Sequence, residues 1–140
     1  MNRRALLRAL AVLMASALAW WFGRPSSQPP GADAEVLGAF RDQRSGVMVE
    51  LDAQVTRLLP DDTIGSPHQR FIVRLAGGHT LLVSHNIELA ARVPVAVGDR
   101  VRLRGQYEWN PQGGVLHWTH HDPGGEREGG WISLEGTTYR

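Results

Sequence analysis

The chain has 140 residues, with 15 arginines, no lysine, 14 acidic residues, no cysteine and a formal net charge of +1. This length allows one domain with a short extension. The absence of cysteine excludes disulfides, thiolate nucleophiles and thiolate metal sites. A hydrophobic content of 42%, with 16 glycines and 8 prolines, fits a turn-rich globular β protein rather than a disordered chain.

The first 24 residues have the layout of an export signal rather than of a folded domain. Three arginines lie within residues 3–8 and an apolar run follows over residues 9–22, as in the basic and hydrophobic regions of a signal peptide. Ala17-Leu18-Ala19 fits a cleavage site, but two tryptophans follow it directly, and bulky aromatic residues disfavour cleavage there. Uncleaved, residues 5–22 would form a helix of about 27 Å, long enough to anchor the chain in the inner membrane.

Both interpretations of this segment, signal peptide or membrane anchor, place the rest of the chain in the periplasm or cell envelope, secreted or anchored to the inner membrane. The reason is that the positive charge stays on the cytoplasmic side. The alternative is an amphipathic or buried helix of a cytosolic protein. Without the four arginines of residues 1–24, 11 arginines face 14 acidic residues, so the remainder has a formal net charge of −3. It lacks the overall basic surplus that non-specific polyanion binding usually needs.

The rest of the sequence divides into a linker and a β domain. Residues 25–45 contain prolines and serines that disfavour both helix and core, although residues 34–41 fit a short helix. From Gly46 onward the hydrophobic residues repeat with a period of two. We therefore predict a signal peptide or anchor over residues 1–24, a linker over residues 25–45 and one β domain over residues 46–140.

Stretches of alternating polar and apolar residues predict the strands. The first strand begins at Val47 and continues to Thr56. A loop is expected at Pro60-Asp61-Asp62, where the two carboxylates are more typical of a turn than of a catalytic pair. Further strands are expected over residues 70–75, 80–85, 100–105, 115–119 and 130–134, with a helical turn over residues 87–92.

Three strands, a short helical connector and two more strands follow the order of an OB-fold. We expect an all-β, OB-like barrel of five to six strands, closed or partly open, preceded by the N-terminal hydrophobic helix. Such a barrel leaves few exposed strand edges. An irregular β-sandwich is the structural alternative.

The segment from His117 to Asp122, His-Trp-Thr-His-His-Asp, contains three of the six histidines of the chain. Imidazoles and carboxylates bind metals, transfer protons and hold polar ligands. Neighbouring side chains of a strand point to opposite faces, so His117 is expected to face inward with Val115. His120 would face the other way, and His121 and Asp122 would belong to the following turn. Any site must therefore include residues from other segments.

The sequence predicts a polar pocket at one mouth of the barrel. His85 has the parity of the inward residues of its strand, and the third and fifth strands of an OB-fold are neighbours, so His85 is expected to approach His117. The candidate members of the pocket are His68, His85, Glu108, His117, His121 and Asp122. Four of them offer the donor types of a divalent metal site, such as zinc: His85, His117, His121 and Asp122. The alternative is a structural network in which buried polar side chains bond to the backbone and fix loops.

Arginines define a second candidate surface. Alternate positions of two predicted strands, with one tryptophan, form a candidate face for an anion or other ligand: Arg70, Arg74, Arg102, Arg104 and Trp118. OB-folds use such faces to bind oligonucleotides and oligosaccharides. The alternative is cross-strand pairing of the arginines with Glu50 and Asp52 of the first strand. Tyr107 and Trp109 have the parity of core residues and are expected inside.

Several stretches between Ser45 and Tyr139 together carry a family resemblance. They are Leu58-Leu59-Pro60-Asp61-Asp62, His68-Gln69-Arg70-Phe71, His85-Asn86-Ile87-Glu88-Leu89-Ala90, Tyr107-Glu108-Trp109-Asn110, Gly113-Gly114 through His117 to Pro123, and Gly130-Trp131-Ile132. With these stretches the chain resembles a bacterial family of unknown function, domain of unknown function 3465. Members often have a histidine near the position of Arg127. The resemblance implies a small exported protein without an established activity.

We expect an exported ligand- or partner-binding module of the cell envelope with a His- and Asp-rich pocket. Its partners would be the inner membrane, if the N-terminal segment is uncleaved, and an oligosaccharide, oligonucleotide or protein ligand. The alternative is a metal-dependent hydrolase in which a metal-activated water attacks a phosphodiester. The sequence contains no Gly-x-Ser-x-Gly nucleophile elbow, phosphate-binding loop or dinucleotide motif, and whether the protein is an enzyme stays open.

Overall fold

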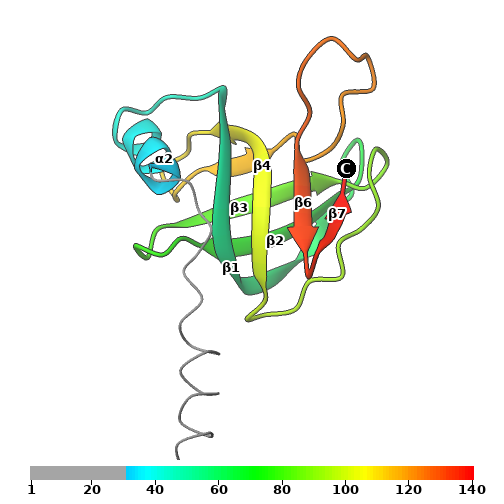
Figure 1. Cartoon of the computed structure of the whole chain (residues 1–140), viewed down its shortest axis with the longest axis horizontal. Coiled ribbons are helices and arrows are strands. Elements are labelled where there is room, and N and C mark those ends of the chain that lie inside the picture. The colour runs from blue at the N-terminus through cyan, green and yellow to red at the C-terminus, as the bar shows by residue number, and fades with distance from the viewer. Residues whose placement is uncertain (1–30) are drawn as a thin grey trace, which may run out of the picture.

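The computed structural model describes residues 31–140, which form a ring of strands with one helix and a C-terminal hairpin (Figure 1). The elements are α2 (Ala32–Arg41), β1 (Val47–Asp62), β2 (His68–Arg74), β3 (Thr80–Asn86), β4 (Arg100–Glu108), β5 (Val115–His117), β6 (Trp131–Leu134) and β7 (Thr137–Tyr139). The predicted N-terminal hydrophobic helix and its cleavage site lie outside the described residues. Within residues 31–140, no helix has the length and apolar character needed to span a membrane.

Five strands close on themselves in the order of an OB-fold. β1 pairs with β2 and β4, β2 with β3, β3 with β5, and β5 with β4. The pairing of β3 with β5 is parallel and the others are antiparallel. β6 and β7 extend the sheet from β4 outside the ring. The prediction of an all-β, OB-like architecture is confirmed, and the strands form one closed ring instead of two stacked sheets.

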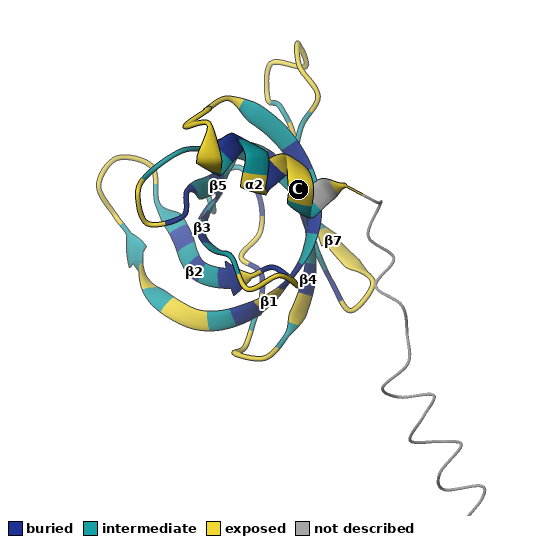
Figure 2. Ribbon diagram, turned by 90° about the vertical axis from the view of Figure 1, so that its left-hand side faces the viewer, coloured by how far each residue is buried: buried dark blue, intermediate teal, exposed yellow. Residues whose placement is uncertain are grey.

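Apolar side chains at alternate positions of the strands fill the interior of the ring. On β4, for example, Val101, Leu103, Gly105 and Tyr107 are buried, and the alternate residues between them are partly exposed. Figure 2 shows the buried residues alternating along the strands that surround the interior. Each such aliphatic or aromatic side chain contributes about 1.5–3 kcal/mol when it is fully buried. The Tyr107 hydroxyl donates a hydrogen bond of 3.0 Å to the carbonyl oxygen of Gly113, so its one polar atom is satisfied in the core.

The helix α2 lies across one end of the ring (Figure 2). Its Val36 and Ala39 side chains are fully buried, and the ring of Phe40 lies 4.9 Å from the ring of His79, just before β3 begins. Since β3 runs away from this point, its last residues lie at the opposite end. There Gln69 holds Val93 of the β3–β4 connector with two hydrogen bonds, of 2.7 and 2.9 Å, so both ends of the core are covered.

Most strands begin or end within three residues of the prediction, and the differences that bear on the fold concern β1, β5 and β7. β1 continues through Pro60 to Asp62, where a loop was expected, because two irregularities in its pairing with β2 accommodate a residue that lacks a backbone N–H. β5 ends at His117 instead of continuing to residue 119. β7 was not predicted, since two of its three residues are exposed and it shows no apolar alternation. The expected helical turn over residues 87–92 is a single turn, closed by a 3.2 Å bond from the Ala90 N–H to the Asn86 carbonyl.

Replacement of Gly130 by alanine should destabilise the fold. Gly130 is buried before β6, and a Cβ atom there would overlap the carbonyl oxygens of Trp118 and Arg104. Overpacking of this kind costs about 1–3 kcal/mol. Urea denaturation followed by tryptophan fluorescence should show this loss for Gly130→Ala. The control Gly77→Ala, where the added methyl would meet open space, should change the free energy of unfolding by less than about 0.5 kcal/mol. Equal stability of the two variants would contradict the packing described here.

Candidate functional site

Five of the six histidines lie at one end of the ring. β3 and β5 are parallel and finish at this end, and β2, antiparallel to β3, begins there. His120 lies centrally in this group. Positive charge on neighbouring imidazoles would lower the pKa of His120, and charge on His120 would lower the pKa of His85. The members of this His-rich end are His68, His85, His117, His120 and His121. The segment after β5 therefore lies near His68 of β2 and His85 of β3, as the sequence predicts.

His85 is fully buried at the end of β3. Its Nε2 lies 3.0 Å from the carbonyl oxygen of Ala91, which can only accept, so Nε2 carries the proton. Its Nδ1 lies 2.7 Å from the hydroxyl of Thr119 and accepts from it when the imidazole is neutral. Burial lowers the pKa of His85 because a charged ring is poorly solvated there. Both ring nitrogens are thus used to join β3, the β3–β4 connector and the segment after β5.

His117 lies on the outer face of the ring, so the expected inward orientation is wrong. The fully buried residue of β5 is Leu116, which lies in register with the buried Val83 of β3. The prediction assigned Val115 to the interior, but Val115 is partly exposed, like His117. The residue that this segment presents to His85 is Thr119, which the sequence analysis did not include among the candidates.

A polar chain crosses the outer face of β4 and β5. Glu108 accepts hydrogen bonds from Nε2 of His117 at 3.1 Å and from the Gln106 amide at 2.6 Å. The side-chain oxygen of Gln106 in turn accepts from the guanidinium of Arg127. Partial burial alone would raise the pKa of Glu108, but the bonds from Gln106 and His117 hold it below its usual value. Two of the candidate pocket residues, Glu108 and His117, are therefore paired with each other, away from His85.

Trp118 has an unusual backbone conformation directly after β5. Its φ of 57° is left-handed, which is uncommon for a bulky residue, and the next two residues, Thr119 and His120, are both buried. Arg127 lies 4.3 Å above the centre of the Trp118 ring, a cation–π contact, and the ring of His120 lies 4.7 Å away. The ring of Trp118 is thus in contact with two side chains of its own segment, so it is not an open ring on the candidate ligand face.

His120 is part of the same folded segment. Its Nδ1 donates a 2.6 Å hydrogen bond to the carbonyl oxygen of His121, while the side chain of His121 itself is exposed. Burial lowers the pKa of His120. At the edge of the group, His68 donates from Nδ1 to the carbonyl oxygen of Ser66 at 2.7 Å. Each of these bonds fixes a turn of the backbone.

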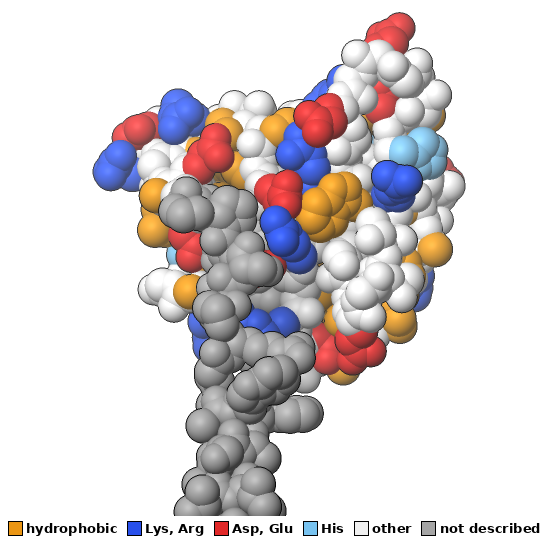
Figure 3. Space-filling view, in the orientation of Figure 1, with side chains coloured by type: hydrophobic (Ala, Val, Ile, Leu, Met, Phe, Trp, Pro, Cys, Tyr) orange, Lys and Arg blue, Asp and Glu red, His pale blue; other side chains and the backbone are white. Residues whose placement is uncertain are grey.

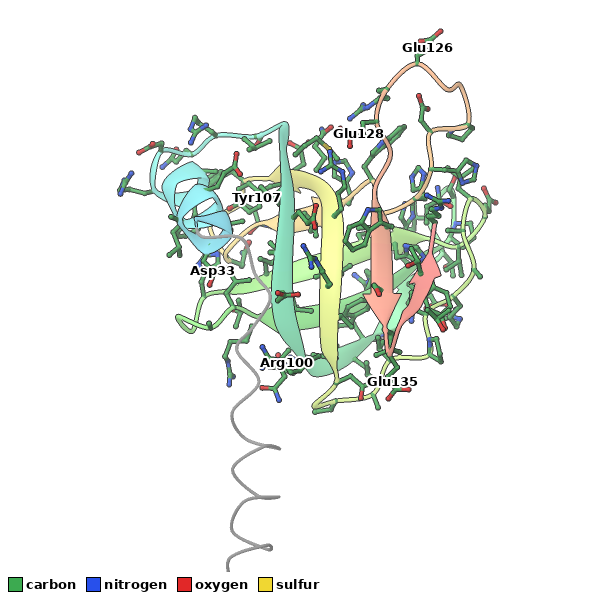
Figure 4. All side chains as sticks on the ribbon, in the orientation of Figure 1. Asp33, Arg100, Tyr107, Glu126, Glu128 and Glu135 are labelled. Atoms are coloured by element: carbon green, nitrogen blue, oxygen red, sulfur yellow. The ribbon has the colours of Figure 1, made fainter. Side chains whose placement is uncertain are left out.

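Asp122 organises the loop between β5 and β6. Its Oδ1 accepts from the N–H of Gly124 at 3.2 Å, and its Oδ2 accepts from the N–H groups of Glu126 and Arg127, both at 2.9 Å. These backbone donors, with Arg127 first, lower the pKa of Asp122. Figure 4 shows Glu126 at the tip of this loop and Glu128 nearer to β6. The carboxylate thus holds the loop in the shape that brings Arg127 over Trp118.

The four candidate metal ligands do not converge. His85 uses both ring nitrogens within the fold, His117 is paired with Glu108, and Asp122 accepts from its own loop. Across residues 31–140, no group of three or more His, Asp and Glu side chains is arranged to hold a metal ion.

Two arginines of β4, Arg102 and Arg104, are paired with acidic residues, as the cross-strand alternative expected. Arg102 donates from Nε and Nη2 to one oxygen of Glu50, at 3.0 and 2.6 Å. Arg104 lies 2.7 Å from Glu128 and 3.8 Å from Glu50. Asp52, the other expected partner, has one buried oxygen without a hydrogen bond.

The arginines of β2 lie on the other side of β1, so the predicted arginine face is divided. Arg70 donates from Nε to the carbonyl oxygen of Pro60 at 2.9 Å. Arg74 is exposed and forms no ion pair with any residue that the structure describes. Arg102 and Arg104 of β4 are therefore compensated by acidic residues, whereas Arg74 of β2 is not.

A surface pocket of about 260 Å³ lies between β4, β6 and the β5–β6 loop. Three of its lining residues were candidates from the sequence: Arg104, His121 and Asp122. Three residues that complete the charged and aromatic lining were not predicted from the sequence: Glu128, Trp131 and Arg140. The only sequence signal for them was Gly130-Trp131 at the start of the last predicted strand. Figure 3 shows charged side chains of both signs around a large apolar side chain on this face of the molecule.

The fold and this arrangement define a small OB-like domain with a His-rich end and a mixed polar and aromatic surface pocket. The chain belongs to the family described as protein of unknown function (DUF3465), whose profile matches residues 22–140. The resemblance identified from its motifs is thereby confirmed. No curated protein matches the sequence.

The stability of the protein should fall as the pH falls below about 6.5. Because burial lowers the folded-state pKa of His85 and His120 below the usual 6.5, the unfolded chain binds protons first in this range. The contribution of each neutral histidine to the free energy of unfolding is complete above its pKa in the unfolded chain. This contribution is lost as the pH falls through its pKa in the folded protein. The slope is at most about 1.4 kcal/mol per pH unit for each group.

The variant His85→Gln separates the contribution of His85 to the pH dependence of stability from that of His120. At neutral pH it should lose about 1–3 kcal/mol, because the bonds to Thr119 and Ala91 are disturbed. Below about pH 6.5 its stability should depend less steeply on pH than that of the wild type. Urea denaturation at a series of pH values measures both effects. A slope identical to that of the wild type would show that the buried imidazole of His85 does not titrate as described.

Removal of the Asp122 carboxylate should loosen the β5–β6 loop. Asp122→Ala leaves three backbone N–H groups without their acceptor, so the loop should open more often and trypsin should cleave faster after Arg127. Mass spectrometry of the fragments measures the rate. Glu126→Ala, at the exposed tip of the same loop, is the matched control and should be cleaved at the wild-type rate. Equal cleavage of both variants would argue against this role of Asp122.

Proposed function

We propose that the protein is an exported oligosaccharide-binding module of the cell envelope. The observation that carries the proposal is the pocket between β4, β6 and the β5–β6 loop, in which the ring of Trp131 lies among Arg104, Glu128 and Arg140. A sugar presents an apolar face of C–H groups and a rim of hydroxyl groups. It therefore suits an aromatic wall that is surrounded by hydrogen-bond donors and acceptors.

The charge of the pocket favours a neutral polar ligand over a polyanion. Two arginines, Arg104 and Arg140, are balanced there by two carboxylates, Asp122 and Glu128. Arg104 is also shared between Glu128 and Glu50. Oligonucleotide binding needs a basic surface and open aromatic rings. The net charge of −3 after residue 24 and the ring of Trp118, which side chains of its own segment contact, offer neither, whereas OB-folds also serve as oligosaccharide-binding domains.

The envelope location rests on the N-terminal sequence. A basic start and a short apolar run within the first 24 residues support export, by a cleaved signal peptide or an inner-membrane anchor. Cell-wall glycans are the oligosaccharides of that compartment. The alternative of a metal-dependent hydrolase needs at least three converging ligands, and residues 31–140 contain no such group.

Calorimetric titration of the full-length chain, kept in solution with a nonionic detergent, tests the proposal. Soluble cell-wall glycan fragments should bind with an affinity that changes little between two salt concentrations, and a single-stranded oligonucleotide should not bind. Trp131→Ala should weaken glycan binding by about tenfold, since a stacked ring contributes on the order of 1 kcal/mol or more. Trp131→Phe keeps a ring and should retain most of the affinity.

The matched control is Arg100→Ala, which removes an exposed arginine of β4 outside the pocket. It should bind glycan as the wild type does, while Arg140→Ala should bind more weakly. An absence of binding to every glycan, or binding to the oligonucleotide that weakens steeply with salt, would refute the proposal.

A further inference from the structure

A second pocket, of about 230 Å³, lies on the outer face of β1, β2 and β3, beside the β4–β5 loop. Leu59, Ile72 and Leu82 give it an apolar floor. Ile72 lies in register with Leu82, and Leu82 in register with Val115 of β5. An apolar row therefore crosses neighbouring strands on the outside of the ring, where solvent-facing strand residues are usually polar.

The β4–β5 loop forms one wall of this second pocket, which we call the groove, and hydrogen bonds hold the loop in place. The side-chain oxygen of Asn110 accepts from the N–H groups of Gln112 and Gly114, at 3.0 and 2.9 Å. The carbonyl oxygen of Gly114 accepts from the N–H of Leu82 at 3.0 Å, which ties the loop to β3. Gly114 has a φ of 101°, and a Cβ there would overlap the ring of Tyr107, so only glycine fits this approach. The groove is thus preformed.

Two positive charges without an ion pair in the described residues lie beside the apolar floor. Arg57 lies directly opposite Ile72 in the pairing of β1 with β2, and Arg74 lies two residues along β2 from Ile72, on the same face. Both side chains are exposed, and neither forms an ion pair within residues 31–140. This contrasts with Arg102 and Arg104 of β4, which acidic residues neutralise.

We propose that this groove docks an extended acidic segment of a partner protein. One apolar side chain enters the pocket, and carboxylates on either side of it meet Arg57 and Arg74. The volume of about 230 Å³ suits one anchoring side chain. In an extended chain, residues two apart face the same side at about 6.6 Å. This spacing matches that between Ile72 and Arg74 along β2, while Arg57 lies across the strand pair from Ile72.

The pocket is lined by no aromatic ring, so it offers no platform for a nucleobase. Its apolar floor of Leu59, Ile72 and Leu82 therefore favours a peptide side chain over a nucleotide, and the nearby arginines favour an acidic peptide. The surface is separate from the proposed glycan site, and its occupation does not depend on that site.

Fluorescence anisotropy with full-length protein in nonionic detergent tests the docking surface. The probe is a fluorescein-labelled peptide, Thr-Glu-Thr-Leu-Thr-Glu-Thr, with two comparison peptides in which the glutamates are lysines or the leucine is serine. The parent peptide should bind saturably, and each comparison peptide about tenfold more weakly or not at all. The double variant Arg57→Glu/Arg74→Glu should lose about tenfold in affinity for the parent peptide and gain affinity for the lysine peptide.

The control Arg100→Glu reverses an exposed charge on β4 and should bind the parent peptide as the wild type does. Urea denaturation should show that both variants are folded. Three results would overturn the proposal: no binding of the parent peptide, equal binding of the lysine peptide to the wild type, or unchanged binding by the double variant. Self-association or oligonucleotide binding that is lost in the double variant, without peptide binding, would assign the face to another occupant and overturn it as well.

Discussion

The ring depends on one short parallel contact between β3 and β5. Only Leu82 with Val115 and Val83 with Leu116 are in register there, whereas β1 and β4 share eight register pairs. Beyond this contact the backbone ladder ends, and side chains continue the connection. The buried pair of His85 and Thr119 joins the end of β3 to the segment after β5. A neutral imidazole therefore completes a closure that the strands alone make only over a short length.

This closure explains why some polar residues have a structural role and others remain available to a ligand. The imidazoles nearest the core are bonded to backbone or hydroxyl groups, which is the structural network expected as the alternative to a pocket. The groups that remain available lie farther out, in the β5–β6 loop and on the outer faces of the strands. Asp122 and Arg127 shape that loop, and the loop in turn forms one wall of the pocket beside Trp131. Structural and ligand-facing residues are thus neighbours in the sequence but separate in space.

The sequence predicts the long strands well and the ends of the ring poorly. On β1 and β4, burial alternates over several consecutive residues, so parity alone identifies the core. On β5, three residues are too few to decide which face is buried, and the left-handed Trp118 then breaks the parity that would place Thr119 and His120. His85 was correctly expected to face inward, but its bond to Thr119 depends on residues 34 positions apart and has no local signal. The pocket residue Arg140 is likewise brought to β4 only by the C-terminal hairpin.

The C-terminal hairpin has a consequence for the behaviour of the protein in solution. β4 pairs with β5 near its end and with β6 near its start, so the sheet continues past the ring and finishes at β7. An unpaired sheet edge is a template for pairing with other chains and hence for aggregation. Here that edge is three residues long, Thr137–Tyr139, and follows a tight turn at Glu135 and Gly136, both with positive φ. An edge this short offers a second copy too few backbone groups to extend the sheet, so the hairpin protects the sheet that continues from β4 against edge-to-edge association.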